Sequence, residues 1–126
     1  MAITARRQAA RGTPVYVIPG GAPGLKIRGN IDLTKRPIVR NANGSISTVK
    51  SVSWNVPIRV DNRVENLEVL MPEVIGNAVV SARSALRHFE STGQHLGMFD
   101  TAAHANVYAV RLHKWQAAYY RKYLKR

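Results

Sequence analysis

The sequence predicts an α+β domain in which a small antiparallel sheet is followed by two α-helices. Apolar and polar residues alternate over residues 37–54 in a pattern typical of a β-hairpin, and one or two further strands follow it. Apolar residues then recur at helical spacing over residues 77–91 and 101–124. Proline and glycine are concentrated near the start of the chain. We therefore divide the 126 residues into an extended arm, residues 1–28, and a single domain, residues 29–126.

The predicted arm is basic and is interrupted too often to form a helix. Its breaks are Gly12-Thr13-Pro14, Pro19-Gly20-Gly21 and Pro23-Gly24. Residues 15–18 have the composition of a short strand. We expect this strand to add to a sheet edge of a neighbouring protein, and the arm to become ordered on that partner.

The sheet region begins with the strongest local pattern in the chain. Asn43-Gly44 supplies the positive φ values of a tight hairpin turn, and residues 46–54 alternate between apolar and polar side chains. Further strands are predicted at residues 56–60 and 66–71, with residues 61–63 as the turn between them. Pro57 restricts its strand to an edge or to a strand start.

The two predicted helices differ in their faces. In the first, Val79, Ala82, Leu86 and Phe89 share one side, with Asn77 as N-cap and Gly93 as terminator; Arg83, Arg87 and Glu90 lie opposite. The second begins after Asp100 or Thr101. Each residue advances about 100° around a helix. The packing face of this second helix should therefore comprise Ala105, Tyr108, Leu112, Trp115, Tyr119 and Tyr123. Its opposite face is cationic and comprises Lys114, Arg121, Lys122 and Lys125.

Composition excludes several classes of protein. There is no cysteine, so disulfides, thiolate metal sites and thiol nucleophiles are absent. No apolar run approaches the ~20 residues that span a bilayer, and the N-terminus lacks the apolar core of a signal peptide. We expect a soluble intracellular product. The net charge of +12 comes from both ends of the chain, because residues 41–76 hold three basic and four acidic residues. A field of this sign attracts nucleic acid, acidic lipid or an acidic protein surface.

No catalytic, cofactor-binding or metal site is predicted. The seven acids are sparse, and Glu65 and Glu68 are expected to be surface partners of Arg59 and Arg63. The histidines, at positions 88, 95, 104 and 113, do not have metal-ligand spacing. His95 is expected to have a structural role through hydrogen bonds with the backbone. Residues 20–26 lack the Gly-Lys-Ser/Thr ending of a phosphate-binding loop and are expected to be a linker.

The basic residues near the two termini are the candidate contact residues for a partner or for phosphates. They are Arg6, Arg7, Arg11, Lys114, Arg121, Lys122, Lys125 and Arg126. They could neutralise phosphates, with neighbouring tyrosines stacking on bases. They could equally form a solvated face or dock on an acidic protein. No recognised nucleic-acid motif accompanies them.

Several segments, in order over roughly residues 28–116, resemble a small domain that recurs in virion proteins of tailed bacteriophages, especially short-tailed, podovirus-like phages. They are Gly29-Asn30-Ile31-Asp32-Leu33, Arg36-Pro37-Ile38-Val39, residues 41–53, Val69-Leu70-Met71-Pro72, residues 92–100 with Thr92-Gly93-Gln94-His95-Leu96-Gly97, and Tyr108-Ala109-Val110-Arg111-Leu112-His113. The domain usually carries acids before and within its first helix, where this chain has Asn77 to Arg83. The resemblance implies a virion component without an activity of its own.

The functional prediction is therefore a structural component of a tailed-phage virion at the head-to-tail junction or tail. It is made in the host bacterial cytoplasm, needs no cofactor, and binds portal, adaptor or tail subunits in several copies within a symmetric assembly. The alternatives are a nucleic-acid-binding protein that contacts phosphates through its basic termini, and an internal virion protein ejected with DNA. Packaged DNA is a further candidate partner, and a membrane is not expected. An enzyme of cell-wall entry is the least favoured class.

Overall fold

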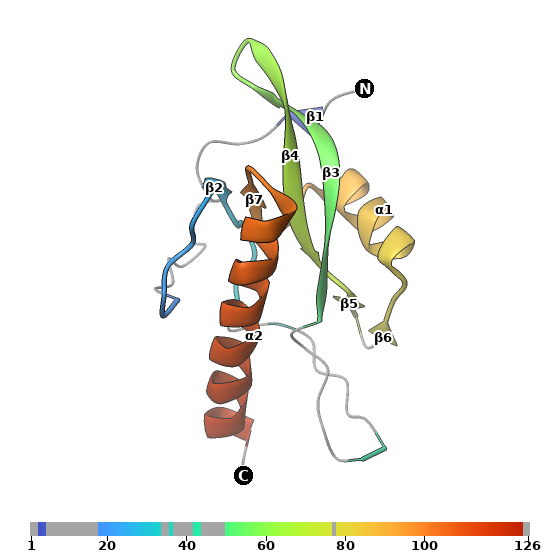
Figure 1. Ribbon diagram of the computed structural model, residues 1–126. Helices are drawn as coiled ribbons and strands as arrows, with labels where there is room; N and C mark the ends of the chain where they lie inside the picture. The colour runs from blue at the N-terminus through green and yellow to red at the C-terminus, as the bar shows by residue number, and fades with distance from the viewer. Residues whose placement is uncertain are drawn as a thin grey trace.

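In the computed structural model, a five-stranded sheet lies between two helices, α1 (Ala82–Thr92) and α2 (Ala102–Leu124) (Figure 1). The structure describes residues 3–4, 18–33, 36, 42–43, 50–76 and 78–124. The strands of the sheet, in spatial order, are β1 (Ile3–Thr4), β3 (Ser51–Val60), β4 (Arg63–Pro72), β7 (Gly97–Phe99) and β2 (Leu25–Arg28). A separate two-stranded ribbon consists of β5 (Val74–Ile75) and β6 (Ala78–Val79). The predicted α+β class is confirmed.

The longest strands, β3 and β4, form one antiparallel hairpin. Val60 pairs with Arg63, so the loop is the two residues Asp61-Asn62, and Asp61 adopts the positive φ of 57° that such tight loops require. The strands predicted at residues 56–60 and 66–71 are confirmed, but residues 51–60 form a single strand. Pro57 lies just before the two residues that pair with the short β1. Residues 37–41 and 44–49, which hold most of the other predicted hairpin, lie outside the described residues.

The far edge of the sheet is built from segments that we expected to be loop or arm. Residues 97–99 form β7, which pairs antiparallel with both β4 and β2. Strand β2 and the buried Ile18 belong to the predicted arm, yet they pack on the body of the protein. The arm prediction missed this because a four-residue strand flanked by glycines has no clear periodicity. Residues 5–17 lie outside the described part of the chain.

Both helices have a defined N-cap. Ser81 caps α1 by accepting a hydrogen bond from the Ser84 amide at 3.1 Å, and Gly93 ends it with φ 73°. The Gly93 terminator is confirmed, whereas the predicted start at residue 77 is wrong, because Val79 lies in β6 and is 40% exposed. Thr101 caps α2 through its Oγ1, which accepts from the His104 amide at 3.2 Å.

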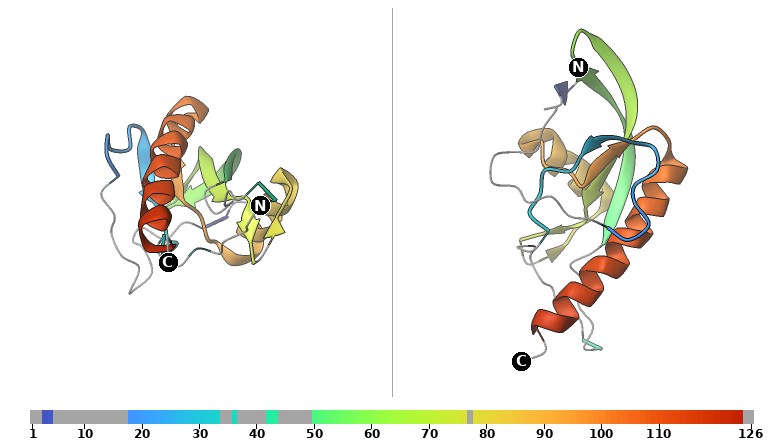
Figure 2. Two further views of the ribbon diagram at one scale, coloured as in Figure 1. Left: turned by 90° about the horizontal axis from the view of Figure 1, so that it is seen from below. Right: turned by 90° about the vertical axis from the view of Figure 1, so that its left-hand side faces the viewer.

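The two helices cover opposite faces of the sheet (Figure 2), and alternate side chains of the sheet pack on opposite helices. Val69 and Met71 join Phe89 of α1 in one core cluster, while Leu70 joins Leu112 of α2 in another. Trp54 also ties the hairpin to α1, since its indole nitrogen donates to the Ala82 carbonyl at 3.1 Å. Burying each of these large side chains stabilises the fold by about 1.5–3 kcal/mol. Neither helix in the described part of the chain has the length and apolar character needed to cross a membrane.

Candidate basic interaction surface

Only some of the predicted contact residues can be placed. Lys114 and Arg121 are exposed on α2. Lys122 lies in α2, but its side chain is outside the described set. The remaining predicted contacts, Arg6, Arg7, Arg11, Lys125 and Arg126, are also outside the described residues. The structure therefore locates one part of the predicted surface, on the outer side of α2.

We call this part the α2 outer face and define it by the exposed residues of the helix from position 106 onward. They are Asn106, Val107, Val110, His113, Lys114, Ala118 and Arg121. Helix α2 contains no acidic residue, so nothing on the helix itself neutralises Lys114 and Arg121. Val110 is 56% exposed and Val107 is 38% exposed. The face thus combines positive charge that no acid of the helix offsets with apolar area, a combination suited to contact with another macromolecule.

The inner side of α2 confirms most of the predicted packing face. Ala105 and Leu112 are fully buried, and Tyr108, Trp115 and Tyr119 are half-buried. Gln116 and Tyr120 are also buried, which the sequence did not reveal. A buried glutamine or tyrosine looks the same in a sequence as an exposed one, because each side chain tolerates both environments.

Arg111 is engaged within the protein and does not belong to the α2 outer face. Its guanidinium donates hydrogen bonds to the carbonyl oxygens of Gly20 and Gly21. The Gly21 amide bonds to the Ile18 carbonyl at 2.9 Å, and the Leu25 amide to that of Ala22 at 3.2 Å. This segment presents carbonyl oxygens to a cation, whereas a phosphate site presents free amides. The predicted linker is therefore a loop packed against α2, and its last two residues begin β2.

A second contact fixes the same loop at the start of α2. The Asp100 amide donates to the Gly24 carbonyl at 3.0 Å, and the Asp100 carboxylate lies 2.6 Å from Nδ1 of His104. This hydrogen bond lowers the pKa of Asp100 below its usual value. A side chain at Gly24 would overlap with both Asp100 and His104, so only glycine allows the loop to approach this closely.

Tyr120 and Arg36 form a buried connection that the sequence did not predict. The Tyr120 hydroxyl donates to the Leu33 carbonyl and accepts from the Arg36 amide, each at 2.9 Å. The Arg36 guanidinium in turn donates to the Val74 carbonyl at 2.7 Å. Burial raises the pKa of Tyr120 and lowers the pKa of Arg36. This chain of contacts joins α2 to the β5–β6 ribbon.

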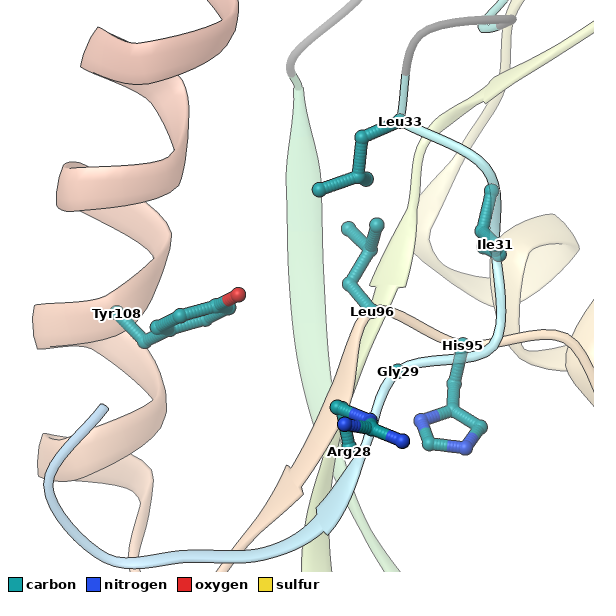
Figure 3. A pocket seen from close by; sticks show the side chains of 7 residues that line it. All are labelled: Arg28, Gly29, Ile31, Leu33, His95, Leu96 and Tyr108. Carbon is teal, nitrogen blue, oxygen red and sulfur yellow. The ribbon is translucent and has the colours of Figure 1, made fainter. Parts of the chain in front are cut away.

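His95 lies at the margin of a small cavity of about 40 Å³ beside Arg28, Leu96 and Tyr108 (Figure 3). Its side chain is 3% exposed, and burial lowers its pKa to about 4, against the smaller opposite effect of a backbone hydrogen bond with Gly97. The His95 amide donates to Oδ1 of Asn30 at 2.9 Å. These contacts agree with the structural role expected for His95. The cavity has room for water and falls well below the ~300 Å³ of small-molecule sites.

The acids of the hairpin have local partners. Glu65 lies 3.6 Å from Arg63, as expected. Glu68 does not pair with Arg59 or Arg63 and accepts hydrogen bonds from Ser53 at 3.3 Å and Asn55 at 2.8 Å. Within the described ranges, no three histidine, aspartate or glutamate side chains gather in a way that could hold a metal ion.

Comparison with protein-family models, with curated proteins and with solved structures finds no match for this chain.

Proposed function

We propose that the chain is a structural component of a tailed-phage virion, situated at the head-to-tail junction or tail, where it binds neighbouring subunits. The α2 outer face is the observation that carries this proposal. Lys114 and Arg121 are exposed without an acid on the same helix, beside the exposed Val107 and Val110. An acidic, partly apolar subunit surface complements such a face in both charge and burial. The resemblance over residues 28–116 supports the choice of a virion.

The other helix supports the choice of α2 as the contact element. Arg83 and Arg87 are exposed on α1, but the exposed Glu90 lies within one turn of Arg87 and offsets its field. The two helices cover opposite faces of the sheet (Figure 2), so the charges of α1 and α2 do not merge into one patch. We therefore expect α2, and not α1, to form a subunit contact that depends on charge.

The test is the presence of the chain in particles of the phage that encodes it. A tagged chain is produced during infection, particles are purified on a density gradient, and the bound chain is quantified against the major head protein. We expect the wild-type chain in the particle fraction and a several-fold loss in the double variant Lys114→Glu with Arg121→Glu. The double variant Lys50→Glu with Arg59→Glu is the matched control, because it reverses two exposed charges away from α2, one just before β3 and one within it. Absence of the wild-type chain from purified particles would refute the proposal.

A nucleic-acid-binding function is the second candidate, either for a free protein or for an internal virion protein ejected with DNA. The rings of Trp115 and Tyr119 stack at 5.5 Å with an interplanar angle of 18°, and the half-buried Trp115 follows Lys114 in the helix. Aromatic rings beside a cation can stack on bases. Binding to a single-stranded oligonucleotide should then weaken with salt, by about 0.7 in the logarithmic slope per phosphate contacted. A slope near zero, or equal affinity in the Lys114→Glu, Arg121→Glu variant, would exclude this function for α2.

A further inference from the structure

A groove of about 390 Å³ lies beside the β5–β6 ribbon, away from the α2 outer face. Arg36, Val74 and Ile75 line it together with His88 of α1 and Gln94. Figure 1 shows the ribbon near the lower end of α1. The volume falls in the ~300–1,000 Å³ range of sites that bind small ligands or short peptide segments.

The position of Arg36 is unusual for a cation. It is half-buried, and its guanidinium bonds to a neutral group, the Val74 carbonyl, at 2.7 Å. Within the part of the chain that the structure describes, no carboxylate lies within ion-pair distance of Arg36. A partly desolvated guanidinium without a counter-ion is energetically costly, and the lowered pKa of Arg36 reflects the same cost. A guanidinium has five N–H donors, so the bond to Val74 leaves others available.

The lining of the groove narrows the class of ligand. Among the described residues that line it, Arg36 is the one arginine or lysine. The apolar ones are Ile75, which is partly exposed, and Pro72 and Val74, which are buried. A polyphosphate or nucleic-acid backbone is usually held by several cations, whereas one arginine matches one carboxylate through paired hydrogen bonds. The exposed part of Ile75 can contact an aliphatic side chain next to that carboxylate.

We infer that this groove binds an acidic peptide segment of a partner protein, whose carboxylate pairs with Arg36 and whose adjoining aliphatic side chain packs on Ile75. The inference goes beyond the proposed virion function and does not depend on it. A chain with 19 basic and 7 acidic residues is expected to favour acidic partners in general, and the groove supplies a defined position for one such contact.

The test is an NMR titration of the ¹⁵N-labelled full chain with acetyl-Leu-Glu-Leu-amide. We expect saturable shifts of the amides of Ile75, Gly76, His88 and Gln94, and at least about tenfold weaker binding of acetyl-Leu-Gln-Leu-amide, which lacks the charge. The substitution Arg36→Gln should weaken binding of the glutamate peptide by a similar factor. Arg87→Gln, which removes an exposed charge from α1 outside the groove lining, should leave binding within about twofold.

A second variant guards against loss of fold in Arg36→Gln. Gln94→Glu places a carboxylate at the exposed rim of the groove and leaves the Arg36 contacts intact, so it should compete with the peptide and weaken its binding. Equal binding of the two peptides, unchanged binding in Gln94→Glu, or shifts confined to α2 would each overturn the inference. Inorganic phosphate is the remaining probe. If phosphate binds as tightly as the glutamate peptide, the groove is a simple anion site and the proposed peptide groove is contradicted.

Discussion

The hydroxyl of Tyr120 donates a 2.9 Å hydrogen bond to the carbonyl of Leu33, which is 87 residues earlier in the chain. The same hydroxyl accepts from the Arg36 amide. One side chain near the end of α2 therefore satisfies two backbone groups of the segment that precedes the β-hairpin. Because buried backbone groups without partners are costly, this contact fixes where the segment lies against α2.

Replacing Tyr120 with phenylalanine tests this connection. The ring remains, but the Leu33 carbonyl and the Arg36 amide lose their partner, so the free energy of unfolding should fall by about 1–3 kcal/mol. Urea denaturation followed by circular dichroism measures the change. Arg121→Gln, at the exposed neighbouring position, should alter the free energy of unfolding by less than about 0.5 kcal/mol. An equal stability of Tyr120→Phe and the wild type would show that water replaces the hydroxyl without cost.

Alanine variants of two glycines in the same loop distinguish the cost of backbone strain from the cost of steric overlap. Gly21 has φ 74° and open space where a side chain would lie, whereas Gly24 has φ 75° and would place a Cβ against Asp100 and His104. Gly21→Ala should cost about 1–2 kcal/mol from the left-handed conformation alone. Gly24→Ala should cost about 1–3 kcal/mol more because of the overlap. Thermal or urea unfolding of both variants measures the difference, and equal costs would contradict the close approach of the loop to α2.

The buried His95 makes stability depend on pH. Its pKa is about 4 in the folded protein and about 6.5 when unfolded, so the unfolded state binds the proton more tightly. The contribution of His95 to the free energy of unfolding is fully present above about pH 6.5 and is lost as the pH falls towards 4. The total loss is up to about 3 kcal/mol. Urea denaturation at a series of pH values measures the loss.

A direct measurement accompanies this series. NMR of the ring protons should show that His95 stays neutral at pH 6, and His95→Gln should flatten the pH dependence of stability between pH 4 and 6.5. The variant His113→Gln removes an exposed histidine and should leave that dependence in place. A His95 ring that titrates near pH 6.5 in the folded protein would contradict its burial.

Arg111 should hold the Gly20–Gly21 turn on α2. In Arg111→Gln, the bonds from the guanidinium to Gly20 and Gly21 are lost, so the Gly21 and Leu25 amides should exchange with solvent several-fold faster. Hydrogen exchange followed by NMR measures this rate. Lys114→Gln, an exposed change on the same helix, is the control and should not alter it. Unchanged exchange in Arg111→Gln would show that Ile18 and the Asp100 contact hold the loop without the arginine.

Much of the fold was accessible from local patterns. The α+β class, a turn within residues 61–63, the Gly93 terminator and the span of α2 follow from hydrophobic period and turn chemistry, which act over a few neighbouring residues. The turn is one residue shorter than predicted, because Arg63 pairs with Val60. The candidate site was accessible in part, because the absence of acids from α2 and the side on which Lys114 lies can be worked out from helical geometry.

Contacts between distant residues decided the rest. Strands β2 and β7 are too short to show a period and exist because they pair with each other and with β4. Arg111 and Arg36 look like the other basic residues in the sequence, yet the fold places one on Gly20 and the other in a groove with Val74. Local propensity determines which segments form helices and strands. Whether a given cation faces solvent or a carbonyl depends on which segments pack together, and only the tertiary structure determines that.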